Sequence, residues 1–369
     1  MIKVIEVSSD SNIGGAGKCL LTYLENYNKN EFDVSVVLPV DSLLKPMVEN
    51  LGVKVYEVDG IGEKSLDIKS ISVLKKLFKE LKPDIVHTHA SMSARIAAKL
   101  AGSKVVYTRH SVFPPSPYIS KGLGKLINGA VNNYFSDEII AVAQAAMDNI
   151  TATGVSDKKI TVVLNGVKGL PTLSDEEKLE IRKRFGVGNK KVISIVARLE
   201  DIKGHDYFIQ AADLLLKQNV DAVFVIAGTG SYELHLKDYV KSLNRENDII
   251  FTGFISDVDK LMSITDIQCN ASYGTEATSL ALLEGMSLGI PAVVSDFGGN
   301  PGVIKNGENG FLFPEKNSEK MAEAIYKLYS DNELYNKMSQ RAIEIFNKTF
   351  TAQAMTENIE KVYRKVIQD

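Results

Sequence analysis

Short apolar runs alternate with longer segments of helical periodicity along the whole chain. Runs of this length, rich in β-branched residues and followed by a helical pattern, are typical of buried parallel strands. In the first half these runs are IKVIEV, FDVSVVL, VKVYEV, DIVHTH, KVVYT, EIIAVA and ITVVLNGV. The alternation predicts an α/β fold with a parallel sheet.

Helical segments between these runs end at residues that stop helices. The pattern predicts helices at about residues 17–27, 68–81 and 90–101. The second should end ahead of Pro83, because proline disfavours helical backbone at the residue before it. The third should end at Gly102, which can take the left-handed conformation of a helix terminus.

A second alternating series follows a polar helical segment at about residues 173–185. Its strand-like runs are KVISIVA, DAVFVIAG, DIIFTGF, TDIQCNAS, IPAVVSD and GFLFP. We predict a second doubly wound domain, with a linker near residues 166–190. A chain of 369 residues is long enough for two cores.

The domain boundaries follow from the two series. We predict an N-terminal domain over residues 1–168, a second domain over 169–350 and a final helix over 351–369. The apolar stripe of that helix consists of Met355, Ile359, Val362, Tyr363 and Val366. Such a stripe must be buried, and we expect the helix to pack back across the domain junction.

Composition narrows the class of protein. With 44% hydrophobic and 24% charged residues the chain is typical of a globular protein, and its net charge of -3 argues against a dedicated nucleic-acid binder. Cys19 and Cys269 lie far apart without the spacing of metal ligands. Met1 leads directly into a strand-like run, so we expect a cytoplasmic protein, with the inner face of the membrane as an alternative place.

One segment stands out by charge. Residues 85–136 contain no Asp or Glu and six basic residues, which predicts a local positive field. Within it, SPYISKGLGKLINGAVNNYF fits an interior helix with two exposed lysines, which we favour. A weak peripheral contact with anionic lipid is the alternative.

A glycine turn follows the first strand-like run, in the segment NIGGAGK that begins at Asn12. It departs from the dinucleotide-binding pattern because Leu20 replaces the third glycine, and from the P-loop because Cys19 follows Lys18. An NAD enzyme or an ATPase is therefore disfavoured. A phosphate-approaching turn and a plain tight turn remain open.

Three histidines follow strand-like runs. His87 and His89 alternate along one strand, and His110 follows the next run. A metal site lacks a carboxylate or third ligand nearby in sequence, so we favour polar cleft residues. His110 is expected either to bind a substrate hydroxyl or to be a satisfied loop histidine.

Two glutamates flank a helix start in NASYGTEATSLALLEGMSLGIPAVVSDFGGNPG. On one continuous helix Glu276 and Glu284 would point roughly 80° apart, so they cannot share a face. We place Glu276 in a loop and begin the helix at Thr278 or Ser279, which are good N-cap residues. The free N–H groups near Ser279 and Leu280 would then attract phosphate. An ordinary helix with two surface glutamates is the alternative.

Two cations follow the first strand-like run of the second half. Arg198 and Lys203 lie in VARLEDIKGHD, where Gly204 begins the next helix. Two positive charges beside a helix start suit a diphosphate leaving group. Taken alone, a solvated loop would be the better explanation, because most exposed Arg and Lys residues have no other role.

Together these motifs resemble a known family. The run from Glu276 to Glu284, with GMSLGIPAVVSDFGGNPGVI after it, is similar to the glutamate, seven residues, glutamate signature of retaining glycosyltransferases of family 4. The Gly14-Gly15 loop, DIVHTH, LNGV, ARLEDIKG, IAGTG and the GF pair ending at Phe254 follow the order of that family. The resemblance covers nearly the whole chain.

The resemblance implies the GT-B fold, in which two Rossmann-like domains face each other across a cleft. It implies transfer of a hexosyl or N-acetylhexosaminyl group from a UDP-sugar, or a GDP-sugar, to a sugar, lipid-linked or small-molecule acceptor. Neither a cofactor nor a divalent metal is expected, and the product would belong to a cell-surface glycan, polysaccharide or glycolipid. A nucleotide-sugar epimerase and a non-catalytic nucleotide-sugar-binding protein remain alternatives.

The resemblance also assigns roles by position. Arg198 and Lys203 would hold the diphosphate, Glu284 would bind the ribose, and Glu276 would contact hydroxyls of the donor sugar, while His110 would lie near that sugar. The positions expected to meet the donor mainly through their backbone are Gly14, Gly15, Phe254, Thr278, Ser279 and Leu280.

Overall fold

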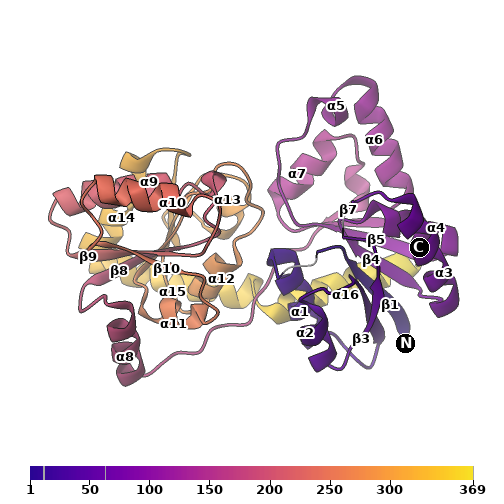
Figure 1. Ribbon diagram of the computed structural model, residues 1–369, viewed down its shortest axis with the longest axis horizontal. Helices are drawn as coiled ribbons and strands as arrows, with labels where there is room; N and C mark the ends of the chain where they lie inside the picture. The colour runs from indigo at the N-terminus through magenta and orange to yellow at the C-terminus, as the bar shows by residue number, and fades with distance from the viewer. Residues whose placement is uncertain (11–12, 63, 369) are drawn as a thin grey trace. The chain divides into compact units, whose positions relative to one another are not determined.

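The computed structural model describes residues 1–10, 13–62 and 64–368. Asn12, at the start of the predicted glycine turn, lies outside the described residues. The chain divides into two compact units (Figure 1). The first comprises Met1–Val167 and Thr351–Asp369, and the second comprises Lys168–Phe350.

A seven-stranded parallel sheet, in the order β3-β2-β1-β4-β5-β6-β7, forms the centre of the first unit. Its strands are β1 (Ile2–Ser8), β2 (Phe32–Pro39), β3 (Lys54–Val58), β4 (Ile85–His89), β5 (Lys104–Arg109), β6 (Glu138–Ala141) and β7 (Ile160–Val162). Val4 pairs with Ile85 and Ser8 with His89, so β1 and β4 end side by side.

Helices connect these strands. They are α1 (Gly15–Asn26), α2 (Lys45–Asn50), α3 (Ile68–Leu81), α4 (Met92–Ala101), α5 (Pro117–Ser120), α6 (Gly122–Tyr134), α7 (Gln144–Ala152), the 3-10 turn η1 (Asp157–Lys159) and α16 (Ala352–Gln368). The predicted helix ends are confirmed at α3, which stops before Lys82 and Pro83, and at α4, which is capped by Gly102 in the left-handed conformation.

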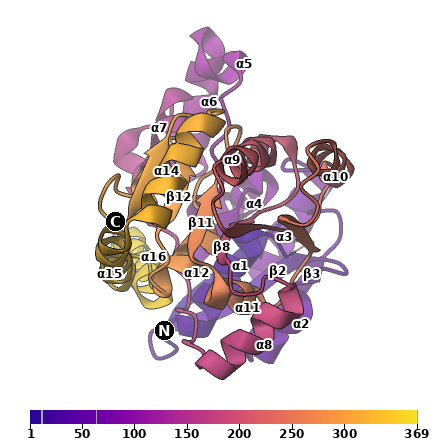
Figure 2. The same ribbon diagram turned by 90° about the vertical axis from the view of Figure 1, so that its left-hand side faces the viewer.

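The second unit repeats the architecture with six parallel strands in the order β10-β9-β8-β11-β12-β13. The strands are β8 (Lys191–Val196), β9 (Ala222–Ala227), β10 (Ile249–Gly253), β11 (Ile267–Asn270), β12 (Ala292–Ser295) and β13 (Gly310–Phe313). Its helical elements are α8 (Asp175–Phe185), η2 (Asp201–Lys203), α9 (His205–Lys217), α10 (Glu233–Ser242), α11 (Val258–Ile264), α12 (Leu280–Ser287), α13 (Asn300–Val303), α14 (Ser318–Ser330) and α15 (Asn332–Thr349). Figures 1 and 2 both show α9 and α14 side by side over one face of this sheet, where Phe208 and Ile325 enter its core.

Each sheet contains one point where the strand order reverses. It lies between β1 and β4 in the first unit and between β8 and β11 in the second. In open α/β sheets the crevice outside the carboxyl ends of such a strand pair is where ligands bind. The topology therefore marks one candidate binding edge in each unit.

The last helix completes the first unit. The predicted stripe of α16 is buried, and it joins the core that β1, β2 and α1 form. Tyr363 is fully buried, with its ring centroid 5.8 Å from that of Phe32 and 6.0 Å from that of Tyr23. Residues from the end of the chain therefore belong to the core that its beginning forms.

The prediction of an interior helix between residues 116 and 135 is wrong. Helix α6 instead exposes a face of large apolar side chains, among them Leu123 and Leu126. The predicted positive field is also smaller than the count of basic residues indicates, because Arg95 is buried and Lys99 pairs with Asp137 at 2.7 Å. None of the helices in the described parts of the chain is long and apolar enough to cross a membrane.

The packing of α16 yields a test of stability. Replacement Tyr363→Phe should lower the free energy of unfolding by about 1–3 kcal/mol, because it removes the hydroxyl that donates to the buried carboxylate of Glu6 at 2.5 Å. Urea unfolding followed by circular dichroism measures this. The matched change Ile367→Ala, at a partly exposed position of the same helix, should cost less than about 1 kcal/mol. Equal costs for the two variants would contradict the assignment.

Candidate functional site

A buried ion pair lies at the carboxyl edge of the second sheet. Lys203 donates from Nζ to Oε2 of Glu276 and to the carbonyl oxygen of Thr275, each at 3.0 Å. The side chains of Lys203 and Glu276 are only 13% and 8% exposed. The structure thus brings together two residues that the sequence assigned to the diphosphate and to the donor sugar.

Two further donors converge on the same carboxylate oxygen. Asn270 Nδ2 donates to Glu276 Oε2 at 3.1 Å, and Ser272 Oγ donates to it at 3.0 Å. A buried carboxylate costs several kcal/mol unless donors satisfy it, and charge-assisted bonds are the strong ones. With Lys203, these donors fix the carboxylate in one orientation.

A second layer of polar side chains holds that arrangement. Asn300 Nδ2 donates to the carbonyl oxygen and to Oγ of Ser295, each at 3.1 Å, and Ser295 Oγ donates to the carbonyl oxygen of Ser272 at 2.6 Å. Four polar residues of this site were not predicted from the sequence, namely Asn270, Ser272, Ser295 and Asn300. For Asn270, Ser272 and Ser295 the signal that could have found them is their position at or just after the carboxyl end of a strand, and for Asn300 it is the first position of the helix that follows β12.

Glycine is required at two positions around the ion pair. Gly204 has a φ of +71°, and a Cβ there would lie 2.1 Å from the carbonyl oxygen of Ala271. Gly298 has a φ of +58°, and a Cβ there would lie 2.1 Å from the carbonyl oxygen of Glu276. Only glycine tolerates both a positive φ and a carbonyl oxygen so close to the position of a Cβ. The two glycines therefore let these turns pack closely on the backbone that carries the site.

Arg198 lies on a loop with a fixed backbone. Ala197 N–H donates to the carbonyl oxygen of Ala227 at 3.1 Å, and Leu199 N–H donates to that of Thr229 at 3.0 Å. The Arg198 side chain is exposed, and no hydrogen bond or ion pair with the described residues holds its guanidinium. An exposed cation on a fixed loop is accessible to an anion.

Helix α12 begins where the sequence places it. Ser279 is its N-cap, and its hydroxyl accepts from the N–H of Leu282 at 3.4 Å. Glu276 therefore precedes the helix and Glu284 lies within it, half-buried. The predicted helix start at Thr278 or Ser279 is confirmed, with Ser279 as the cap.

The remaining residues of this unit that were predicted to bind the donor substrate lie at the ends of helices and strands. Thr278 and Leu280 are half-buried on either side of the cap of α12. Phe254 directly follows β10, and its side chain is exposed. The predicted contacts of the backbone at Thr278 and Leu280 with the sugar or phosphate of the donor, and of the backbone near Phe254 with its base, stay predictions.

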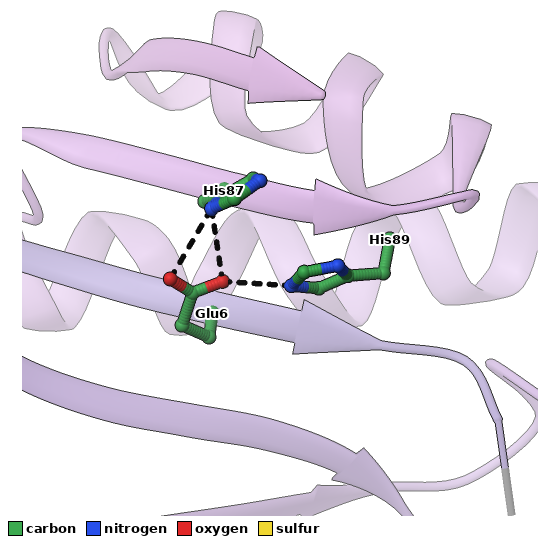
Figure 3. Close-up of side chains that lie close together, drawn as sticks. All are labelled: Glu6, His87 and His89. Atoms are coloured by element: carbon green, nitrogen blue, oxygen red, sulfur yellow. Dashed lines mark hydrogen bonds and ion pairs between the residues drawn. The ribbon is translucent and has the colours of Figure 1, made fainter. Parts of the chain in front are cut away.

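In the first unit a carboxylate lies among histidines, as Figure 3 shows. Glu6 is buried on β1, with Oε2 2.9 Å from Nε2 of His89 and 3.1 Å from Nδ1 of His87. Burial acts to raise the pKa of Glu6, but charge interactions and hydrogen bonds with His87 and His89 outweigh it and hold that pKa well below its usual range. The two histidines are thus buried partners of an ionised carboxylate.

This cluster brings together the atoms of a potential metal site. One ligand atom each of Glu6, His87 and His89 lies within 4.8 Å of the others. The carboxylate of Glu6, which is 81 residues away from His87 in the chain, lies beside both histidines in the fold. Tyr363 and Thr108 also bond to this cluster, at 2.5 Å from Glu6 Oε1 and 2.6 Å from His87 Nε2. These contacts make it a hydrogen-bonded network that needs no ion to satisfy it.

The network extends to His110. Burial lowers the pKa of His89, so its ring is neutral. Because an ionised Glu6 can only accept, that ring must carry its hydrogen on Nε2, which leaves Nδ1 of His89 as an acceptor. His110 Nε2, at 2.7 Å from that Nδ1, must then be the donor. Burial, followed by the neighbouring His89, holds the pKa of His110 well below its usual range. His110 is therefore neutral, with an accepting lone pair on its own Nδ1.

The glycine turn lies at the same edge of the first sheet. Gly14 is the N-cap of α1, and Gly15 is its first residue. A Cβ at Gly15 would meet open space among the described residues, so the backbone there is approachable. A small cavity of this unit is lined by His89, His110 and Asn165. The predicted phosphate contact of Gly14 and Gly15 stays a prediction.

One buried histidine of the second unit has unusual surroundings. His205, the first residue of α9, is fully buried, and neither ring nitrogen has a hydrogen-bond partner among the described residues. Burial, followed by the charge of Lys203, lowers the pKa of His205 to about 4. Its ring is thus neutral at physiological pH, next in the backbone to the turn that carries Lys203.

Family profiles match both halves of the chain. The profile described as "Glycosyltransferase Family 4" matches residues 13–168, and the one described as "Glycosyl transferases group 1" matches residues 177–345. These matches confirm the resemblance that the sequence motifs indicated.

Characterised relatives are similar over most of the chain. A protein of Escherichia coli named UDP-Gal:alpha-D-GlcNAc-diphosphoundecaprenol alpha-1,3-galactosyltransferase is 28% identical, over 98% of this chain and 96% of its own length. The N-acetyl-alpha-D-glucosaminyl L-malate synthase of Bacillus anthracis is 25% identical, over 78% of this chain and 76% of its own length.

Solved structures confirm the predicted GT-B fold. HepE of Anabaena, solved with UDP and glucose, has a TM-score of 0.85 at 22% identity and covers 99% of this chain and 100% of its own. A glycosyltransferase of Rickettsia africae has the same TM-score at 20% identity, over 100% of this chain and 99% of its own.

The buried His205 predicts a pH dependence of stability. Because its pKa is about 4 in the folded chain and about 6.5 in the unfolded chain, the unfolded state binds the proton first. The free energy of unfolding should therefore fall as the pH decreases from about 6.5 to 4, by roughly 3 kcal/mol or less from this group. Replacement His205→Leu should flatten that part of the profile in urea unfolding.

A change at a non-titrating position of α9 serves as the control. Gln210→Leu should shift the stability at pH 7.5 and at pH 4.5 by the same amount. If the difference between the wild type and His205→Leu is also independent of pH, His205 is not a buried neutral group.

The hydrogen-bond chain in the first unit predicts one tautomer. In nitrogen NMR spectra of the protein at pH 7, His110 should show a protonated Nε2 and an unprotonated Nδ1, because Glu6 fixes His89 and His89 fixes His110. A protonated Nδ1 on His110 would contradict the order of donors along the chain.

Proposed function

This chain belongs to glycosyltransferase family 4, and we propose that it moves a sugar from a UDP-sugar to an acceptor hydroxyl with retention of the anomeric configuration. The observation that carries the proposal is the buried pair of Lys203 and Glu276 beside the start of α12. A cation, a fixed carboxylate and the first turn of α12 lie together there, at the point where the strand order of the second sheet reverses.

Lys203 and Arg198 would stabilise the departing diphosphate. As the bond between the anomeric carbon and the phosphate oxygen breaks, negative charge grows on that oxygen. Fixed donors and cations aimed at developing charge are among the strongest catalytic devices. Lys203 is already held by Glu276 and the carbonyl of Thr275, so little reorganisation would be needed. These two cations supply the positive charge, and we propose that transfer requires no cofactor or divalent metal.

Glu276 would position the donor sugar and not attack it. Its Oε2 accepts from three donors, including the ammonium of Lys203, and such an oxygen is a weak nucleophile. We propose that the acceptor hydroxyl attacks the anomeric carbon from the face that the diphosphate leaves. The new carbon–oxygen bond forms as the old one breaks, and the hydroxyl proton passes to the departing phosphate oxygen.

The relatives support UDP as the nucleotide and a glycan acceptor. The Escherichia coli protein is named for transfer from UDP-Gal to a sugar on diphosphoundecaprenol, and HepE was also solved with UDP-glucose. We propose a hexosyl or N-acetylhexosaminyl donor and a lipid-linked sugar acceptor, in the synthesis of a polysaccharide or another cell-surface glycan.

A thermal-shift screen with UDP, GDP, ADP and their sugars identifies the nucleotide. A ligand that binds only the folded state raises apparent stability by mass action, by about 2.7 kcal/mol at a concentration of 100 Kd. Selective stabilisation by UDP and a UDP-sugar would support the proposal. Stabilisation by GDP or ADP alone would overturn the choice of nucleotide.

The reaction type needs a separate measurement. Proton NMR of a reaction with the selected donor and a sugar acceptor should show a product with the anomeric configuration of the donor. An inverted product would overturn retention. Donor isomers formed without acceptor would indicate an epimerase, and binding without any turnover would indicate a non-catalytic protein.

Replacement Lys203→Ala should lower kcat by about 100-fold to 1,000-fold, because it removes charge stabilisation of the leaving diphosphate. The exposed change Lys241→Ala in the same unit should leave kcat unchanged. Circular dichroism must show that both variants are folded, since the first leaves Glu276 buried without its cation. A near-normal kcat in folded Lys203→Ala protein would refute the role of Lys203.

A further inference from the structure

Helix α6 of the first unit turns its apolar face outward. The exposed fractions are 72% for Leu123, 69% for Leu126, 56% for Ile127 and 71% for Tyr134. On an α-helix these positions lie within one stripe, since they follow each other at intervals of three, one and seven residues. A helix at the surface of a globular domain normally turns such a stripe toward the core.

The inward face of α6 is made of small and polar residues. Gly129 packs so closely on the backbone of Gly154 that a Cβ would lie 2.1 Å from its carbonyl oxygen. Asn128 Nδ2 donates to the carbonyl oxygen of Thr153 at 2.8 Å, and Asn132 Oδ1 accepts from the guanidinium of Arg95 at 2.9 Å. Specific contacts therefore fix which face of α6 points out, and the outward apolar stripe is built into the fold.

The apolar surface continues onto α5. Tyr118 is 88% exposed and Ile119 is 40% exposed. Figures 1 and 2 both show α5 at the tip of its own unit, beyond α7 and away from the sheet. Exposed apolar side chains that gather on two helices packed against each other mark an interaction site, because they gain free energy when they leave water.

We propose that α5 and α6 dock on an anionic lipid bilayer, with their apolar side chains in the boundary between headgroups and acyl chains. Charge supports this occupant. No acidic residue occurs in residues 85–136, and Lys121 is exposed between the two helices. Tyr118 and Tyr134 mark the two ends of the surface, and tyrosine suits the membrane interface because its ring is apolar and its hydroxyl polar.

Apolar burial supplies most of the binding and charge adds to it. Lysines near an anionic surface each contribute favourably, but this surface has few of them, whereas its large apolar side chains are numerous. Binding should therefore require the apolar stripe and be strengthened by anionic lipid. It does not depend on the proposed sugar transfer, because no residue of the candidate donor site is part of this surface.

Vesicle flotation tests the proposal without any donor or acceptor. The wild-type protein should float with vesicles of phosphatidylglycerol and phosphatidylcholine, and less with phosphatidylcholine alone. The triple change Leu123→Ser, Leu126→Ser and Ile127→Ser should lower binding to the anionic vesicles at least tenfold. Replacement Lys121→Glu should lower it a few-fold and narrow the difference between the two kinds of vesicle.

A control with equally exposed apolar residues excludes a general effect of surface hydrophobicity. Leu234 and Ile68 are 72% and 82% exposed, and their change to serine should leave flotation unchanged. Circular dichroism confirms the fold of each variant. Equal flotation of the wild type and the triple variant would overturn the proposal.

Sedimentation velocity separates a lipid surface from a protein interface. A dimer of the wild type that the triple change dissociates, with no flotation of either protein, would show a second copy of the chain as the occupant and overturn the proposal. Because flotation is measured without substrate, a protein that floats but transfers no sugar refutes the proposed function alone. A protein that transfers sugar but does not float refutes the membrane surface alone.

Discussion

Both units are organised around a carboxylate that is buried near the carboxyl edge of a parallel sheet. Glu6 and Glu276 are 1% and 8% exposed, and a buried charge is tolerated only where donors surround it. Around Glu6 the donors come from β4 and α16, and around Glu276 they come from η2 and the residues at and after the end of β11. Because each buried carboxylate requires hydrogen-bond donors around it, it constrains how strands, turns and helices meet at the edge where ligands bind.

The sequence predicts the two parallel sheets, because alternating apolar and helical periods are local properties of the chain. It also predicts the start of α12, since the capping preference of Ser279 is local, and it brings Lys203 and Glu276 into one site through their places at strand ends. The resemblance to a known family was needed to assign functions to Lys203 and Glu276. The polar residues around Glu276 could not be predicted as site residues. Without the tertiary contacts, nothing distinguishes Asn270, Ser272 and Asn300 from other polar residues near the ends of strands and helices.

Two features depend on contacts that no local pattern contains. Glu6 lies inside an apolar strand, and its partners His87 and Tyr363 come from segments far away in sequence. Periodicity detects the stripe of α6 but not the direction in which it points. That direction is set by the close approach of Gly129 to Gly154 and by the bond between Asn132 and Arg95. The expectation of an interior helix followed from the usual rule that apolar faces point inward, and this helix breaks that rule.

The return of α16 to the first unit has a consequence for synthesis on the ribosome. Tyr363 and Glu6 are separated by 357 residues, and the whole second unit lies between them in the chain. The second unit ends at Phe350, so all of it is made before α16, the helix that completes the first unit. The core around β1 and β2 therefore stays incomplete while the second unit is being made. During this interval the first unit is exposed to chaperones and proteases, and the interval lasts until α16 has been made.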